Sequence, residues 1–105
     1  MTPQLYEIFD AHVKFGKVSY PRPCVIIGCG ENEFAVVAIS SALDLYKGPH
    51  VHFRLDMSNP DFAATGLNKE SFAASHPIQS LALDKFIRKR GRLEGAMLKR
   101  FLEWI

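Results

Sequence analysis

The chain has 105 residues, of which 48% are hydrophobic and 23% charged, and its formal net charge is +2 at pH 7. This length suits one hydrophobic core and is too short for two, so we expect a single domain over residues 1–105. The net charge is too small to indicate nucleic-acid binding by itself, and no apolar stretch approaches the ~20 residues of a membrane span, so no membrane partner is expected.

The N-terminal residues 1–12 are acidic rather than basic and lack the apolar core of a signal peptide, which predicts a cytoplasmic protein. The two cysteines, Cys24 and Cys29, are few and are not spaced like a metal-binding pair. We interpret them as structural thiols.

The first part of the chain predicts a short helix followed by a strand. In residues 4–10 the apolar side chains of Leu5, Ile8 and Phe9 fall on one side of a helix of one or two turns. Residues 11–15, with the sequence AHVKF, are typical of a strand.

The stretch SYPRPCVII follows, and in it Arg22 stands between Pro21 and Pro23, ahead of an unbroken apolar run. Proline has no backbone N–H to donate and holds its neighbours extended. We therefore expect residues 16–23 to form a connection, with Arg22 at the entrance of a buried strand over 24–28.

Two further strands are predicted on either side of a loop. Residues 30–33, GENE, are a hairpin turn signal that leads into a returning strand over 34–41. After a reversal at Gly48-Pro49, apolar and polar residues alternate over 51–57, which indicates a strand with Val51, Phe53, Leu55 and Met57 toward the core.

The remaining sequence predicts a loop, short strands and a final helix. Residues 58–68 are typical of a loop with a short turn, and residues 70–83 of short strands interrupted at Pro77. From residue 93 onward helical spacing predicts one amphipathic helix. Its apolar face is expected to carry Leu93, Met97, Leu98, Phe101, Leu102 and Ile105.

Residues 85–92, KFIRKRGR, contain five of the thirteen Lys and Arg side chains. Such a cluster is usually a solvated face, and otherwise it meets phosphate or an acidic peptide.

Together these elements predict a mainly β domain, a small and strongly bent sheet or barrel with one C-terminal helix laid across it. The sequence has no Gly-rich phosphate loop, no Cys-x-x-Cys and no His-Glu-x-x-His. We therefore expect no metal and no cofactor.

The order of several segments resembles one family. YPRPCVII, then FAVVAISS, then TGLNKESFA and the tail from His76 to Ile105 resemble, in sequence order, the landmarks of the PemK/MazF toxins of bacterial type II toxin–antitoxin modules. The resemblance implies an SH3-like small barrel of the CcdB/PemK/MazF type. It also implies a homodimer that cleaves single-stranded RNA without a metal ion, inhibits growth and is held inactive by a cognate antitoxin protein.

The resemblance also implies the catalytic residues, which by position are Arg22 and Ser40. A guanidinium stays charged and can donate two parallel hydrogen bonds to a phosphate, which suits Arg22 to stabilising a pentacovalent phosphorus. A hydroxyl is a poor acid or base, so Ser40 is expected to bind the phosphate. The alternative for Ser40 and for its neighbour Ser41 is that they satisfy backbone groups at a strand end.

Four further side chains are candidates for binding RNA: Lys14, Lys17, Ser41 and His52. The lysines flank the first connection, where a cation can meet phosphate, although most such lysines are only solvated. His50 and His52 share one face of a predicted strand and can contact RNA, or can simply form its polar side.

Two other functions remain open. DNA gyrase poisons of the CcdB type share this barrel, and a fold does not determine a function. The chain can also be a catalytically inactive binding module, in which Arg22 contributes only to structure.

Overall fold

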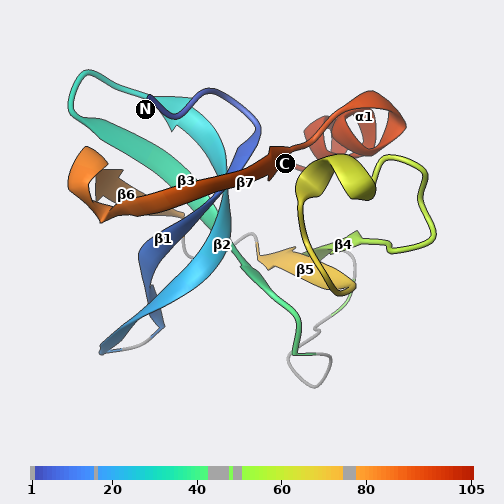
Figure 1. Cartoon of the computed structure of the whole chain (residues 1–105), viewed down its shortest axis with the longest axis horizontal. Coiled ribbons are helices and arrows are strands. Elements are labelled where there is room, and N and C mark those ends of the chain that lie inside the picture. The colour runs from blue at the N-terminus through green and yellow to red at the C-terminus, as the bar shows by residue number, and fades with distance from the viewer. Residues whose placement is uncertain (1, 16, 43–47, 49–50, 75–77) are drawn as a thin grey trace.

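The computed structural model describes residues 2–15, 17–42, 48, 51–74 and 78–105. Within these ranges the chain forms seven strands, two short 3-10 helices and one α-helix (Figure 1). The strands are β1 (Glu7–Phe15), β2 (Val18–Cys29), β3 (Glu33–Ser40), β4 (His52–Leu55), β5 (Ser71–Ala74), β6 (Gln79–Ala82) and β7 (Phe86–Arg92). The helices are η2 (Ala63–Thr65), η3 (Leu83–Lys85) and α1 (Gly95–Trp104).

The strands pair in the order β4-β5-β3-β2-β1-β7, with β6 added beside β3, and every neighbouring pair is antiparallel. Strand β3 changes partner along its length: it pairs with β2 up to Ala38 and with β5 at Ile39 and Ser40. In the described part of the chain β4 and β7 remain edges, so the sheet is bent but not closed. The predicted mainly β class with a C-terminal helix is confirmed.

The central parts of β1, β2 and β3 are buried on both faces, which explains the apolar runs within β2 and β3. Successive side chains of a strand point to opposite faces, so each strand supplies both cores. One core contains Phe9, Ala11, Val13, Cys24, Ile26, Phe34, Val36, Ala38, Leu81 and Phe86. The other contains Ile8, Val25, Val37, Ile39, Leu55, Phe62, Leu67, Ala73, Leu93, Met97 and Phe101.

Helix α1 covers the second core, as the amphipathic pattern predicts. Phe101 is fully buried and lies edge-on to the Phe53 ring of β4, with the ring centroids 5.4 Å apart. The predicted apolar face is too wide, because Leu102 is 44% exposed and Ile105 is 51% exposed. The apolar stripe of a ten-residue helix against a small core is narrow, so its margins face water.

The helix predicted over residues 4–10 is wrong, because β1 already begins at Glu7. Tyr6 has a positive φ of 66° and marks a turn instead. Its N–H donates to the carbonyl oxygen of Ile26 at 2.7 Å, and its own carbonyl accepts from Leu93 at 2.8 Å. Pairing with distant segments therefore outweighs a weak local helical pattern.

Residues 16–23 are also not a connection throughout, because β2 begins at Val18 and Pro21, Arg22 and Pro23 lie inside it. In this part of β2, residues 18–23 pair with β1, whereas β3 joins β2 only from Cys24 onward. The Pro-Arg-Pro stretch therefore lies along a sheet edge, where a missing N–H is tolerated.

The later predictions are largely confirmed. Gly30 donates its N–H to the Glu33 carbonyl at 2.8 Å in the predicted hairpin turn, and η2 is the predicted turn in the loop. The predicted strand over 51–57 is shorter, and Met57 is 56% exposed instead of buried, because β4 ends at Leu55. Pro49, His50, His76 and Pro77 lie outside the described residues.

Candidate functional site

A pocket of about 280 Å³ opens where β3 leaves β2 and turns to β5. Cys24 of β2 lies opposite Ala38 of β3, and the same register continued by two residues leads to Arg22 and Ser40. Both residues line the pocket, and Ser41 does so as well. The fork between the strands therefore brings together three residues that the sequence singled out.

The pocket carries an excess of positive charge. Its lining includes the cationic side chains of Arg22, Lys69 and Arg90, and none of the described lining residues is a carboxylate, a histidine or a cysteine. A surface with a net positive charge attracts a phosphate. This arrangement suits an anionic ligand.

Arg22 is exposed and projects from the edge portion of β2. Its guanidinium carbon lies 5.8 Å from the centre of the Tyr20 ring, two residues earlier on the same face of the strand. In the described part of the chain no carboxylate lies within ion-pair distance of it. The guanidinium thus packs over an aromatic ring, and its N–H donors can bind a ligand.

Ser40 ends β3, and its Oγ accepts a hydrogen bond from the backbone N–H of Ala42 at 3.2 Å. This contact is the strand-end role that the sequence left as an alternative. A hydroxyl has one hydrogen to donate and two acceptor lone pairs, so Oγ can also donate toward the pocket. The two roles of Ser40 are compatible.

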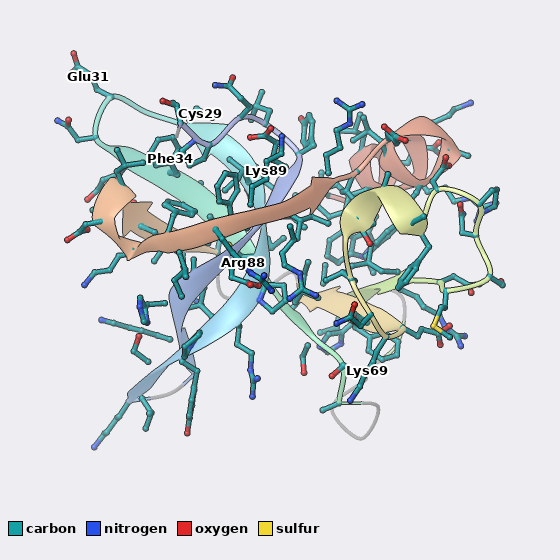
Figure 2. The ribbon with its side chains drawn as sticks, in the orientation of Figure 1. Cys29, Glu31, Phe34, Lys69, Arg88 and Lys89 are labelled. Atoms are coloured by element: carbon teal, nitrogen blue, oxygen red, sulfur yellow. The ribbon has the colours of Figure 1, made fainter. Side chains whose placement is uncertain are left out.

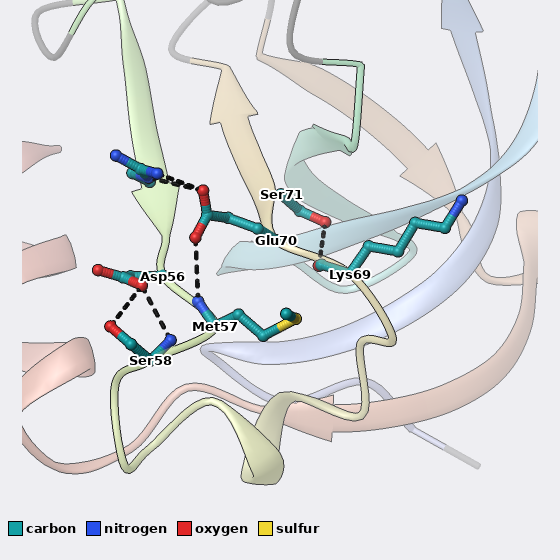
Figure 3. Close-up of polar contacts among 7 residues, drawn as sticks. Asp56, Met57, Ser58, Lys69, Glu70 and Ser71 are labelled. Carbon is teal, nitrogen blue, oxygen red and sulfur yellow. Dashed lines mark hydrogen bonds and ion pairs between the residues drawn. The ribbon is translucent and has the colours of Figure 1, made fainter.

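Lys69 and its neighbours reach the pocket from the segment that leads into β5 (Figure 3). Lys69 and Glu70 point in opposite directions, Lys69 away from the Glu70 carboxylate. Glu70 accepts from the Nε of Arg54 at 2.9 Å and from the backbone N–H of Met57 at 3.4 Å. The Ser71 hydroxyl donates to the Lys69 carbonyl at 2.8 Å, which fixes the backbone that carries Lys69.

Three of the predicted RNA-binding residues lie elsewhere. Lys14 lines a second, wider pocket of about 800 Å³ together with His12 and Lys85. Lys17 is exposed between the end of β1 and the start of β2. His52 lines a third pocket beside Trp104. Their RNA-binding roles stay predictions.

Sequence reasoning missed the other polar members of the first pocket, which are Asn68, Lys69, Ser71 and Arg90. Asn68, Lys69 and Ser71 belong to the stretch TGLNKESFA, which carried the resemblance, but nothing in their spacing pointed to a ligand. Arg90 belongs to the basic cluster 85–92. No sequence pattern distinguishes it from its basic neighbours.

Most of the basic cluster is paired at the surface, as the solvated-face interpretation predicts. Arg88 contacts Asp10 at 2.8 Å, Lys89 contacts Glu7 at 2.6 Å and Arg92 contacts Glu94 at 2.9 Å. Figure 2 shows Arg88 and Lys89 along β7, whereas Lys69 lies beyond β5.

The described residues contain neither a metal-ligand cluster nor a membrane-spanning helix. No group of three or more His, Cys, Asp or Glu side chains gathers there in a way that could hold a metal ion. Within the same residues, no helix has the length and apolarity needed to span a membrane. Both cysteines are free. Burial, assisted by the nearby negative charge of Asp10, raises the pKa of the Cys24 thiol to about 12.

No protein-family model and no curated protein matches the chain. Among solved structures, the Mycobacterium tuberculosis toxin MazF-mt6 matches with a TM-score of 0.69 at 18% sequence identity, over 94% of this chain and 91% of that one. The chain has a MazF-like fold. At this identity the similarity shows the fold alone, and it confirms the fold that the sequence resemblance implied.

In this fold the segments that carry the family resemblance come together at the pocket. The Arg-Pro landmark lies on β2 and the Ser-Ser landmark at the end of β3, and they meet at the fork between these strands. A stretch of some eighteen residues separates Arg22 from Ser40 in the sequence, and only the antiparallel pairing of the two strands joins them.

Proposed function

We propose that this protein is an endoribonuclease toxin of a type II toxin–antitoxin module, which cleaves single-stranded RNA in the pocket between β2, β3 and β5 without a metal ion. The observation that carries the proposal is that Arg22 and Ser40, two residues assigned from the resemblance, line one cationic pocket. The MazF-like fold supports it, since the solved structure is that of a toxin.

In the proposed reaction the RNA supplies its own nucleophile. The 2′-hydroxyl oxygen attacks the adjacent phosphorus, and the bond from phosphorus to the 5′ oxygen of the next nucleotide breaks. The 2′-hydroxyl loses a proton and the departing oxygen gains one, so the products are a 2′,3′-cyclic phosphate and a 5′-hydroxyl. Because no histidine or carboxylate belongs to the described lining, we assign the proton exchange to solvent water.

The pocket contributes positioning and electrostatic stabilisation. The Arg22 guanidinium donates to the non-bridging oxygens, whose negative charge grows as the phosphorus becomes pentacovalent. The Ser40 hydroxyl donates to the same phosphate while its oxygen accepts from Ala42. Ser41 and Lys69 line the same wall and add contacts to the RNA backbone.

The resemblance implies two protein partners, an antitoxin and a second copy of the chain. A cationic pocket also attracts the acidic segment of an antitoxin, which would compete directly with RNA. We further propose a homodimer. Sedimentation of the purified chain, alone and with its antitoxin, measures both assemblies.

The test is cleavage of a long single-stranded RNA in excess EDTA, with the ends of the products mapped. Wild type is expected to leave 2′,3′-cyclic phosphates at discrete sites. Removing a donor that stabilises transition-state charge typically lowers a rate by about 10²–10³, and we expect Arg22→Ala to do so. Ser40→Ala is expected to lower the rate less, because the phosphate keeps its contact with Arg22.

Arg92→Gln is the matched control, since Arg92 pairs with Glu94 and is not among the pocket residues. It is expected to cleave as wild type does. Intact RNA with wild type, or equal rates for wild type and Arg22→Ala, overturns the proposal. Inhibition of DNA supercoiling with intact RNA would indicate a gyrase poison instead.

A further inference from the structure

Arg90 differs from the other basic residues of β7 in its burial. Its side chain is 16% exposed, whereas those of Arg88 and Arg92 are 67% and 64% exposed. It also lines the same pocket as Arg22, and these two neighbours do not. A buried guanidinium must have partners, because removing the charge from water costs free energy.

The partners of Arg90 hold one side of its guanidinium. Nε donates to the Gly66 carbonyl at 3.1 Å, and Nη1 lies 3.5 Å from Oδ1 of Asp10. Asp10 is shared with Arg88, whose Nε contacts the other carboxylate oxygen at 2.8 Å. One carboxylate therefore faces two guanidinium groups, and the charge of Arg90 is only partly balanced.

The backbone around Arg90 packs tightly against the segment of η2. A Cβ on Gly66, which has a φ of 71°, would lie 2.0 Å from the Arg90 carbonyl oxygen, and a Cβ on Gly91 would lie 2.1 Å from that of Ala64. The two glycines thus let β7 pack directly against the segment of η2. Arg90 is fixed relative to the pocket wall formed by residues 67–69.

A guanidinium has five N–H donors. The contacts described use the Nε hydrogen and one hydrogen on Nη1, which leaves three donors on the two terminal nitrogens. Two terminal nitrogens of one guanidinium can bind two oxygens of a phosphate. Because Arg90 lines the pocket, we take these donors as the ones that a ligand there would meet.

We propose that Arg90 binds a second phosphate of the RNA backbone, next to the phosphate that Arg22 and Ser40 hold. This inference rests on the proposed function and identifies a substrate-binding residue of the same site. Arg22 is exposed, whereas Arg90 is held in place by Gly66 and Asp10. Arg90 therefore anchors the strand while Arg22 acts on the reacting phosphate.

The experiment measures equilibrium binding of a short single-stranded RNA at several salt concentrations. The RNA carries a 2′-deoxy nucleotide at the mapped cut, which removes the nucleophile. Loss of one phosphate contact weakens binding and lowers the salt slope by about 1, and Arg90→Gln is expected to do both. Arg88→Gln is the control, because it shares Asp10 but lies outside the pocket lining, and it is expected to bind as wild type.

A second measurement distinguishes direct contact between Arg90 and a phosphate from a purely structural role of Arg90. The RNA is made with a neutral methylphosphonate in place of the phosphate on either side of the cut. At one of these positions wild type should lose as much affinity as Arg90→Gln loses with unmodified RNA, and the two changes together should cost no more than either alone. Additive losses at both positions overturn the inference. If Arg90→Gln fails to fold, Arg90→Lys enters the same cycle.

The two proposals can fail separately. If wild type leaves RNA intact, the nuclease proposal fails. Arg90 is then tested on a uniform RNA, in which an unchanged salt slope for Arg90→Gln refutes the anchor and a lowered slope supports it. If wild type cleaves RNA but Arg90→Gln binds it with unchanged affinity and slope, only the anchor is refuted.

Discussion

Arg22 and Arg90 are residues of the same type, but their surroundings in the fold differ. Arg22 can be singled out from the sequence because two prolines flank it. Arg90 cannot, because it stands among basic residues of the same chemistry. Its side chain is mostly buried where Gly66 and Gly91 let β7 approach the η2 segment closely, and no pattern in the cluster 85–92 encodes this approach.

The two cysteines also differ in their surroundings, because Cys24 is buried and Cys29 is exposed. The burial of Cys24 predicts a pH dependence of stability. Cys24 is fully buried and its pKa is raised from 9.0 to about 12. Below pH 9 the thiol is protonated in both states and contributes no pH dependence. Above pH 9 the unfolded chain releases this proton and the folded chain retains it, so stability falls as pH rises toward about 12.

The measurement is the free energy of unfolding of wild type and of Cys24→Ala, from just below pH 9 upward. The stability of wild type relative to Cys24→Ala should fall by at most about 1.4 kcal/mol per pH unit. Cys29→Ala is the control for removing a thiol at an exposed position. Parallel profiles for wild type and Cys24→Ala would contradict the prediction.

At the scale of elements, the Gln79 side chain forms hydrogen bonds to a part of β1 that does not pair with β7. β1 pairs with β7 only as far as Ala11. Beyond it, the Gln79 amide of β6 accepts from the Lys14 N–H at 2.9 Å and donates to the Lys14 carbonyl at 3.0 Å. Gln79 thus imitates a backbone peptide and links β6 to β1 beside the core that contains Phe9, Phe34 and Phe86.

We predict that Gln79→Ala destabilises the protein by about 1–2 kcal/mol, the net value of two hydrogen bonds. Gln79→Glu should also destabilise the protein, since a carboxylate cannot donate to the Lys14 carbonyl. Urea unfolding measures both. Ser80→Ala is the neighbouring control, because its hydroxyl bonds to the Glu33 carboxylate at the surface, and it should cost less. Equal midpoints for Gln79→Ala and wild type would show that the link does not stabilise the fold.

At the scale of the whole molecule, the two cores are not independent. β1, β2 and β3 supply both, with Val25 facing one core and Cys24 and Ile26 the other. Neither core can be lost without disrupting strands that also line the other. We therefore expect the described elements to unfold as one unit.

Phe101→Ala tests this coupling. Truncating a buried Phe costs about 3–5 kcal/mol, and we expect the whole chain to lose that stability. Trp104 fluorescence reports on the core beneath α1, and labelling of the Cys24 thiol, in a Cys29→Ser background, reports on the other. The two transitions should coincide in wild type and shift together in Phe101→Ala, with Leu102→Ala, at an exposed position, as the control. Separate transitions would contradict a single unit.

The amino-acid sequence by itself determined the mainly β class, the hairpin turn at residues 30–33 and the C-terminal helix, and its resemblance to a family suggested Arg22 and Ser40 as candidate site residues. These follow from local signals: turn residues, apolar periodicity, and residue types in a given order. Tertiary structure alone decided the start of β1, the pairing of the Pro-Arg-Pro stretch and the membership of Lys69 and Arg90 in the pocket. The reason is that strand pairing and close backbone contacts join residues far apart in the chain, and a pattern of neighbouring residues does not contain them.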